Sequence, residues 1–194
     1  MTKNEIALAP NAALLVIDVQ KGFDDASYWG PRNNPAAEAN IAALMDAWQE
    51  TGRPVVLVQH ASRTAGSVLA ADHPGHAFKE FVADRAGKAS LLVTKTVNSS
   101  FYGTPDLAAW LTAQGIGQLV VSGIQTNMCV ETTARMAGNL GYDVLVPLDA
   151  THTFDLAGPD GLGLTADELA TATAVNLHGG GFARVVTTAG LLGS

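Results

Sequence analysis

The sequence predicts a three-layer α/β/α domain with a Rossmann-like, mostly parallel sheet of six strands. Six short apolar runs rich in β-branched residues are each continuous rather than alternating, which is typical of strands buried on both faces of a parallel sheet. Helical patterns with short, glycine-ended joints lie between these runs, as expected for strand–helix alternation. The predicted strands are residues 13–19, 54–59, 91–93, 119–121, 144–148 and 184–187.

The sequence contains capping and stop signals that mark the ends of the helices between the strands. Asn34-Pro35 is the expected N-cap and first residue of a helix that stops at Gly52. Thr104-Pro105 is expected to open a second helix that ends at Gly115, and a third is predicted over residues 129–140. These elements alternate with the strands in the order that a doubly covered sheet requires.

A fourth helix is predicted from the motif Thr165-Ala-Asp-Glu168, which has the pattern of a capping box, to about His178. Two longer irregular stretches, residues 22–33 and 61–77, are of the kind that forms lids or oligomer contacts. With no internal repeat or linker, we expect one domain over residues 1–194.

Composition excludes several classes of protein. The formal net charge of −7 and the pI near 5.0 disfavour general binding to nucleic acid or to anionic lipid. A single cysteine cannot form an intrachain disulfide. No apolar run approaches the roughly 20 residues of a membrane span, and the N-terminal residues lack the apolar core of a signal peptide. We therefore expect a cytoplasmic protein.

Polar residues follow several strands at the carboxyl ends, where ligands bind in open parallel sheets. Asp18 follows apolar residues 14–17, and Lys95 follows residues 91–94 in the same way. Because a lysine is rarely buried without a partner, we expect these two side chains to pair. Taken singly, Asp18 equally fits a loop-anchoring carboxylate, and Lys95 fits a surface lysine. The other polar candidates at this edge are Gln20, His60, residues 125–129, Asp149 and His152.

Cys129, the only cysteine, lies at a strand-to-helix joint on the same edge. Free amides and the helix dipole at such a joint are expected to lower the thiol pKa and to stabilise a thiolate. The same amides can receive an oxyanion. A lone cysteine is more often an inert core residue, but this position favours a nucleophile.

The histidines give little support for a metal site. Asp72, His73 and His76 lie in a loop rich in glycine, alanine and proline, without further ligands at a strong metal-binding spacing. His60 ends a strand and is better placed to contact a substrate, whereas His178 is expected to be structural.

Motifs for two common α/β functions are absent. The sequence has no G-x-x-x-x-G-K-[ST] and no G-x-G-x-x-G after the first strand, which disfavours nucleotide binding. It also lacks the G-x-S-x-G nucleophile elbow of serine hydrolases with a similar architecture.

Asp18, Lys95 and Cys129 and the segments around them resemble the isochorismatase-like cysteine hydrolases, the superfamily of nicotinamidases and N-carbamoylsarcosine amidases. The segments that carry the resemblance are residues 13–23, 93–101 and 121–134, with residues 149–154 also matching. All occur in the expected order at strand ends, so the resemblance covers essentially the whole chain.

The resemblance implies that Asp18, Lys95 and Cys129 form a catalytic triad. It also implies a non-proline cis peptide at Ile124–Gln125, which would aim the amide of Gln125, with that of Cys129, at a developing oxyanion. Cys129 would then attack a carbonyl while Asp18 accepts the thiol proton and later returns it to the leaving amine.

One departure from the family bears on metals. Metal-dependent nicotinamidases place an Asp-x-His pair after the second strand, whereas this chain has Val58-Gln59-His60. The missing carboxylate argues against nicotinamidase activity, and we expect neither a metal nor another cofactor. The expected substrate-binding residues are Phe23, Trp29, His60, Tyr102, Ile124 and Phe154.

The leading interpretation is a hydrolase that cleaves a C–N bond of a small amide, ureido or lactam-like substrate through a thioester acyl-enzyme. An isochorismatase-type vinyl-ether hydrolase is the alternative, and a non-catalytic oligomeric binding module is a third. The expected partners are a small-molecule substrate and further copies of the chain, as a dimer or tetramer.

Overall fold

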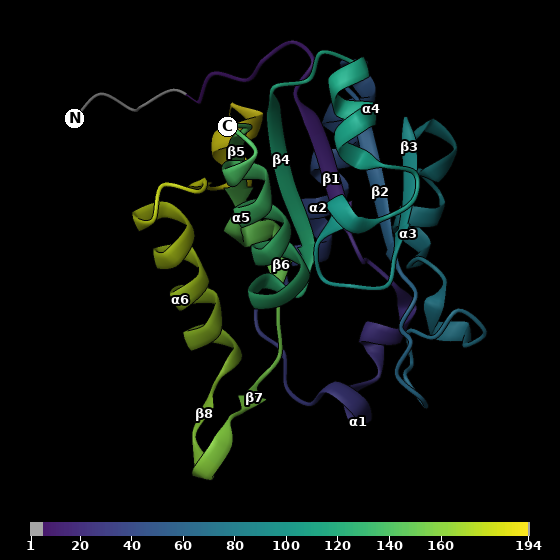
Figure 1. The fold of residues 1–194 in the computed structure, drawn as a ribbon, viewed down its shortest axis with the longest axis vertical. Coiled ribbons are helices and arrows are strands. Elements are labelled where there is room, and N and C mark those ends of the chain that lie inside the picture. The colour runs from purple at the N-terminus through teal and green to yellow at the C-terminus, as the bar shows by residue number, and fades with distance from the viewer. Residues whose placement is uncertain (1–5, 194) are drawn as a thin grey trace.

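The computed structural model describes residues 6–193, and a parallel seven-stranded sheet forms its centre (Figure 1). Six strands lie in the order β3-β2-β1-β4-β5-β9, and the short β6 pairs with the end of β4. All six predicted strands are present. The seventh, β6, was not predicted, because a strand of two residues is too short to show an apolar pattern. The bounds are β1 Ala13–Ile17, β2 Val55–His60, β3 Leu91–Lys95, β4 Gln118–Ile124, β5 Asp143–Pro147, β6 Thr151–His152 and β9 Arg184–Val186.

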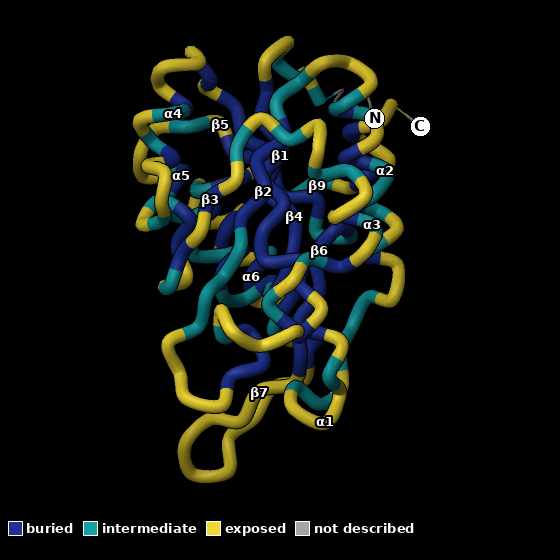
Figure 2. The backbone as a smooth tube through the Cα atoms, turned by 90° about the vertical axis from the view of Figure 1, so that its right-hand side faces the viewer, coloured by how far each residue is buried: buried dark blue, intermediate teal, exposed yellow. Residues whose placement is uncertain are grey.

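Helices cover both faces of the sheet, which confirms the three-layer prediction. One buried cluster joins the sheet to α4, α5 and α6, and a second joins it to α2, α3 and α7. Leu15 and Ile17 of β1 point into the first cluster, while Leu14 and Val16 point into the second. Figure 2 shows the buried strands at the centre, surrounded by more exposed helices and loops. The bounds are α1 Ala26–Trp29, α2 Ala37–Glu50, α3 Glu80–Ala83, α4 Leu107–Ala113, α5 Glu131–Asn139, α6 Ala166–Gly179 and α7 Thr188–Leu192.

The predicted start of α2 is wrong by two residues. The helix begins at Ala37, and Asn34 lies outside it with a φ of 44°. The Asn34 side-chain amide instead donates to the carbonyls of Asp149 at 3.0 Å and Thr151 at 2.6 Å. These long-range bonds occupy the side chain that the sequence pattern assigned to capping.

The predicted start of α4 is also wrong. Thr104-Pro105 is joined by a cis peptide and does not belong to the helix. Asp106 is the N-cap, and its carboxylate accepts a hydrogen bond from the Ala109 amide at 3.0 Å. By contrast, the Thr165 capping box at the start of α6 is confirmed by reciprocal bonds with Glu168.

A small antiparallel hairpin of β7 Leu156–Ala157 and β8 Gly163–Leu164 projects from the carboxyl end of the sheet (Figure 1). Within residues 6–193, no helix combines the length and apolarity needed to cross a membrane. Single 3-10 turns occur at Lys21–Asp24, Pro74–His76, Ala86–Lys88, Ser100–Tyr102, Leu148–Ala150 and Pro159–Gly161.

Candidate active site

The candidate site lies at the topological switch point of the sheet, between β1 and β4. From β1 the chain continues to β2 and β3 on one side, and it later returns to β4 and β5 on the other. Gly123 at the end of β4 pairs with Ile17 and has a φ of 126°, and a Cβ there would lie 2.1 Å from the Ile17 carbonyl oxygen. This close approach brings Asp18, directly after β1, beside the turn that carries Cys129.

Asp18 and Lys95 form a fully buried ion pair. Lys95 Nζ lies 2.7 Å from Asp18 Oδ2, and neither side chain is exposed to solvent. The second carboxylate oxygen, Asp18 Oδ1, is also buried and accepts no hydrogen bond within the part of the chain that the structure describes. Asp18 therefore keeps one oxygen available for a further proton donor.

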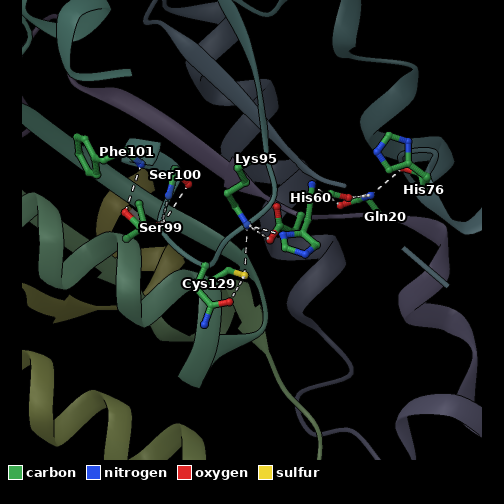
Figure 3. A network of polar contacts seen from close by, with 11 residues as sticks. Gln20, His60, His76, Lys95, Ser99, Ser100, Phe101 and Cys129 are labelled. Atoms are coloured by element: carbon green, nitrogen blue, oxygen red, sulfur yellow. Dashed lines mark hydrogen bonds and ion pairs between the residues drawn. The ribbon is translucent and has the colours of Figure 1, made fainter. Parts of the chain in front are cut away.

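Cys129 completes the cluster. It lies in the π-helical turn Thr126–Val130, which precedes α5, so the predicted third helix is divided into two parts. Lys95 Nζ donates to Cys129 Sγ at 3.3 Å, and the thiol makes a long contact of 3.9 Å with Asn98 Oδ1 (Figure 3). The ammonium of Lys95 thus links the carboxylate to the sulfur.

The expected lowering of the Cys129 pKa is wrong. Burial of the sulfur raises the pKa of the thiol, and the neighbouring Asp18 carboxylate raises it further. Lys95 acts in the opposite direction but does not outweigh them. The sequence places the thiol at a helix start, where the dipole favours a thiolate, but it does not show the burial. These surroundings favour the neutral thiol beside the ion pair.

The peptide bond Ile124–Gln125 is cis, as the resemblance implies. The Gln125 carbonyl accepts the amides of Met128 and Val130, at 3.1 and 3.2 Å, which closes the turn around Cys129. The turn is also tied to β6, because Thr126 donates to the hydroxyl of Thr151 at 2.8 Å. The short β6 that the sequence did not predict therefore supports the cysteine turn.

His60 contacts the ion pair directly. Its Nδ1 lies 3.2 Å from Lys95 Nζ, and burial, followed by the charge of Lys95, lowers the pKa of the imidazole. Gln20 accepts the His60 amide at 2.9 Å and donates to the His60 carbonyl at 3.0 Å (Figure 3). The candidates Gln20 and His60 thus lie with the triad residues, and the Nδ1 of His60 faces Lys95.

The aromatic residues that were expected to line one pocket lie in two separate places. Phe23, Trp29 and Phe154 stack on one another, with ring centroids 4.9 to 6.1 Å apart. Ile124 is fully buried in the same core cluster. Tyr102 lies apart from them, largely exposed to solvent.

A cleft of about 680 Å³ is lined in part by Asn98 and Tyr102. Asn98, one of its lining residues, also contacts the cysteine, with Oδ1 3.9 Å from Cys129 Sγ. None of the three triad residues lines this cleft or a larger hollow of about 1490 Å³ between α6, β9 and α7. The smaller cleft is the candidate substrate site because Asn98 both lines it and contacts the thiol. Its lining residues are Val97, Asn98, Ser99, Tyr102 and Thr132.

Asp18, His60 and Cys129 also have the composition of a metal site, with potential ligand atoms within 4.8 Å of one another. The ammonium of Lys95 contacts all three side chains, at 2.7, 3.2 and 3.3 Å. A cation is therefore already present among these groups as part of the chain. His73 and His76 remain in the loop, where His73 Nδ1 accepts the amide of Gly75 at 2.9 Å.

Sequence reasoning missed Asn98 and the contact between His60 and Lys95. Asn98 lies only three residues after Lys95, within a segment that carried the family resemblance. The pairing of His60 with Lys95 follows from the β2–β3 register, which places the two residues opposite each other. Only the order of the strands in the sheet reveals that neighbourhood.

Comparisons with known proteins agree on one family. The isochorismatase domain model matches residues 12–186. The Bacillus subtilis isochorismatase family protein YrdC is 39% identical over 176 residues, which cover 91% of each chain. An isochorismatase-family crystal structure from Chromobacterium violaceum has a TM-score of 0.88 at 41% identity and covers 96% of this chain and 94% of the other. The ureidoacrylate amidohydrolase RutB of Stutzerimonas stutzeri is 40% identical over 186 residues, covering 78% of this chain and 73% of the relative.

Proposed function

The chain belongs to the isochorismatase family of hydrolases, and on that premise we propose that it is a cysteine hydrolase that cleaves a C–N bond in a small amide, ureido or lactam-like compound. Cys129 is the nucleophile, Asp18 the proton carrier, and Lys95 the cation that stabilises both anions. The observation that carries this proposal is the ammonium of Lys95, 2.7 Å from the carboxylate and 3.3 Å from the sulfur.

The first half of the reaction forms a thioester. The sulfur of Cys129 attacks the substrate carbonyl while the thiol proton moves to Asp18, whose Oδ1 has no hydrogen-bond donor within the described residues. The new S–C bond places negative charge on the carbonyl oxygen. When that intermediate collapses, the C–N bond breaks and the protonated Asp18 gives its proton to the departing nitrogen.

The second half of the reaction hydrolyses the thioester and releases the carboxylic acid product. Asp18, again ionised, removes a proton from a water molecule that attacks the thioester carbonyl. The C–S bond then breaks, and the sulfur takes back the proton from Asp18 to restore the neutral thiol. A neutral resting thiol suits this cycle, because one proton moves between Cys129 and Asp18 in each half-reaction.

The backbone amides of Gln125 and Cys129 are the proposed donors to the carbonyl oxygen. Preorganised amide donors of this kind act most strongly where charge develops in a water-poor site. The cis peptide before Gln125 and the π-helical turn that carries Cys129 place both residues at the same end of β4. Tyr102, on the rim of the cleft, is the proposed contact for the remainder of the substrate.

The side chains that line the cleft favour amide cleavage over vinyl-ether cleavage of isochorismate. Val97, Asn98, Ser99, Tyr102 and Thr132 are all uncharged. Isochorismate carries two carboxylates, and its recognition would call for arginine or lysine side chains in the lining. A neutral amide needs only the hydrogen-bonding groups that Asn98 and Ser99 supply. We therefore propose an uncharged substrate.

The proposed activity can be tested with a panel of small amides, ureido compounds and lactams, together with isochorismate. The expected result is release of ammonia or amine, or ring opening of a lactam to an amino acid, for at least one neutral compound, unchanged after exhaustive chelation, and no pyruvate from isochorismate. Pyruvate release would support the vinyl-ether alternative. No turnover of any compound would favour the non-catalytic binding module.

The nucleophile is tested on the best substrate from the panel. Cys129→Ser should remain folded and lose at least about 100-fold in kcat, because a hydroxyl is much harder to deprotonate than a thiol. Mass spectrometry of rapidly quenched wild-type protein should show one acyl adduct on Cys129. Since the chain has a single cysteine, a disulfide or a second thiol cannot account for that adduct. Wild-type turnover by Cys129→Ala would refute the assignment.

A further inference from the structure

The ammonium of Lys95 has three protein acceptors, one more than the proposed triad supplies. Its three N–H groups face Asp18 Oδ2 at 2.7 Å, Cys129 Sγ at 3.3 Å and His60 Nδ1 at 3.2 Å (Figure 3). An ammonium has three donors and no acceptor, so these contacts occupy it completely. His60 is therefore the third hydrogen-bond acceptor around the ammonium of Lys95.

This contact determines which nitrogen of His60 carries the proton. Because Lys95 can only donate, Nδ1 must present its lone pair, and the ring proton lies on Nε2. A backbone interaction with Val97 acts on the ring in the direction opposite to burial and favours its charged form. The charged and titratable groups around the imidazole are Lys95, Asp18, Cys129 and His76.

The position of the ring is fixed by the sheet. His60 ends β2 and lies opposite Lys95, the last residue of β3, in the parallel register. Gln20 holds the His60 backbone through both its amide and its carbonyl and also donates to the His76 carbonyl at 2.8 Å. Gln20 is itself fully buried, so this clamp is part of the interior.

We propose that His60 is a positioning residue: it accepts the third N–H of the Lys95 ammonium and thereby holds that ammonium between Asp18 and Cys129. This inference rests on the proposed function, because it acts through Lys95 on the reactivity of the thiol. Without the Nδ1 acceptor, one N–H of a buried ammonium lacks a partner, and the ammonium moves away from the sulfur to find one. A thiolate formed at Cys129 then lacks its nearest cation.

The inference can be tested without knowing the substrate. Iodoacetamide alkylates thiolates, and Cys129 is the only cysteine, so the rate of alkylation reports on this sulfur alone. His60→Leu removes the acceptor while keeping a side chain of similar size. It should lower the alkylation rate near neutral pH about tenfold, the effect of one lost hydrogen bond to a charged group. His60→Asn places an amide oxygen near the position of Nδ1 and should recover most of that rate.

His76→Leu is the matched control. The His76 backbone carbonyl takes part in the same clamp, but no contact between its ring and Lys95 occurs within the described residues. Its alkylation rate should equal that of the wild type, and circular dichroism should show that all three variants are folded. Equal rates for His60→Leu and wild type would overturn the proposal. Equally slow His60→Leu and His60→Asn would also overturn it, because the loss would then reflect packing rather than the acceptor.

A second measurement determines the tautomer of His60 in the wild-type protein. Nitrogen NMR of ¹⁵N-histidine-labelled wild-type protein should show the His60 ring with Nδ1 unprotonated and Nε2 protonated near neutral pH. The His60→Asn spectrum assigns the resonance by its absence. A His60 ring protonated at Nδ1 would overturn the proposal. Failure of the proposed hydrolase activity would appear only in the substrate panel and would leave the tautomer and alkylation results standing.

Discussion

His152 shows how one buried residue can control the stability of the molecule towards acid. It lies in β6 with its ring edge against Phe154, 5.4 Å between centroids, and neither ring nitrogen has a partner among residues 6–193. Burial, reinforced by the charges of Arg32 and Lys79, lowers the pKa of His152 to about 3. The folded protein therefore holds this ring neutral across the mildly acidic range.

The resulting pH dependence has a definite sign. In the unfolded chain the imidazole has a pKa near 6.5, so between about pH 6.5 and pH 3 the unfolded state binds one more proton at His152 than the folded state. The unfolding free energy should fall as pH is lowered through this range, by up to about 1.4 kcal/mol per pH unit. His152→Leu should remove that part of the slope, as measured by urea unfolding between about pH 7 and pH 5.

His178→Leu provides the comparison for His152. His178 is exposed near the end of α6, where its Nδ1 accepts the amide of Val185 at 3.2 Å. An unchanged slope in His152→Leu would show that His152 is protonated or solvated in the folded protein.

The residues of the site could be predicted from the sequence more readily than their chemical state. Asp18, Lys95 and Cys129 each follow an apolar run, and strand ends of a parallel sheet converge. The raised pKa of Cys129 could not be predicted, because it depends on burial and on an Asp18 carboxylate 111 positions away. Likewise, only the strand register shows that His60 faces Lys95.

Among the elements, an ionic network centred on Lys79 joins three segments beside the site. Lys79 Nζ contacts Asp24 at 2.6 Å and Glu38 at 2.5 Å, and Arg32 also contacts Glu38 at 2.9 Å. Burial alone would raise the pKa of Glu38, but the hydrogen bonds from Lys79 and Arg32 outweigh it and lower the pKa. The network holds the loop that carries Asp24 and Arg32 against the first turn of α2.

Lys79→Met should destabilise the fold measurably. The Lys79 side chain is only 6% exposed, so its removal leaves Glu38 and Asp24 without their buried partner. We expect the unfolding free energy to fall by about 1–3 kcal/mol, the usual range for hydrogen bonds to charged groups. Chemical denaturation of the purified variant near neutral pH measures this difference.

Lys21→Met is the matched comparison at the same loop. Lys21 pairs with Glu80 at 3.6 Å, but the two side chains are 46% and 85% exposed. Solvent screens such a pair, and its loss should change stability by less than about 1 kcal/mol. Equal effects of the two substitutions would mean that the Lys79 network contributes no more than a surface ion pair.

Element types could be predicted better than element ends, for a physical reason. Apolar periodicity reports burial along a strand or helix and was sufficient for six of the seven strands of the sheet and for α2, α4 and α6. Caps depend on where a side chain finds its partner. The Asn34 side-chain amide donates hydrogen bonds to β6 and to the turn before it. Thr104 pairs with Thr94 in an isolated β-bridge. Both are tertiary contacts that local sequence does not contain.

At the scale of the whole molecule, the β7–β8 hairpin exposes an apolar surface that a single copy leaves uncovered. Leu156, Leu162 and Leu164 are 45%, 68% and 46% exposed. Figure 2 shows the hairpin as an exposed projection at one end of the molecule. A two-stranded hairpin is marginally stable by itself in water. Its leucines would gain stability if they were buried against another surface.

We propose that the chain forms a homo-oligomer in which this hairpin packs against a second copy. Light scattering coupled to size-exclusion chromatography, at micromolar concentration, should give a mass of at least twice the 20.0 kDa of one chain. Leu162→Asp places a charge on the hairpin and should shift the mass towards one chain, because a buried unpaired charge is costly. Val175→Asp, at an equally exposed position on α6, should leave the mass unchanged. A 20.0 kDa wild-type species would refute the oligomer, and dissociation by Val175→Asp alone would place the interface on α6.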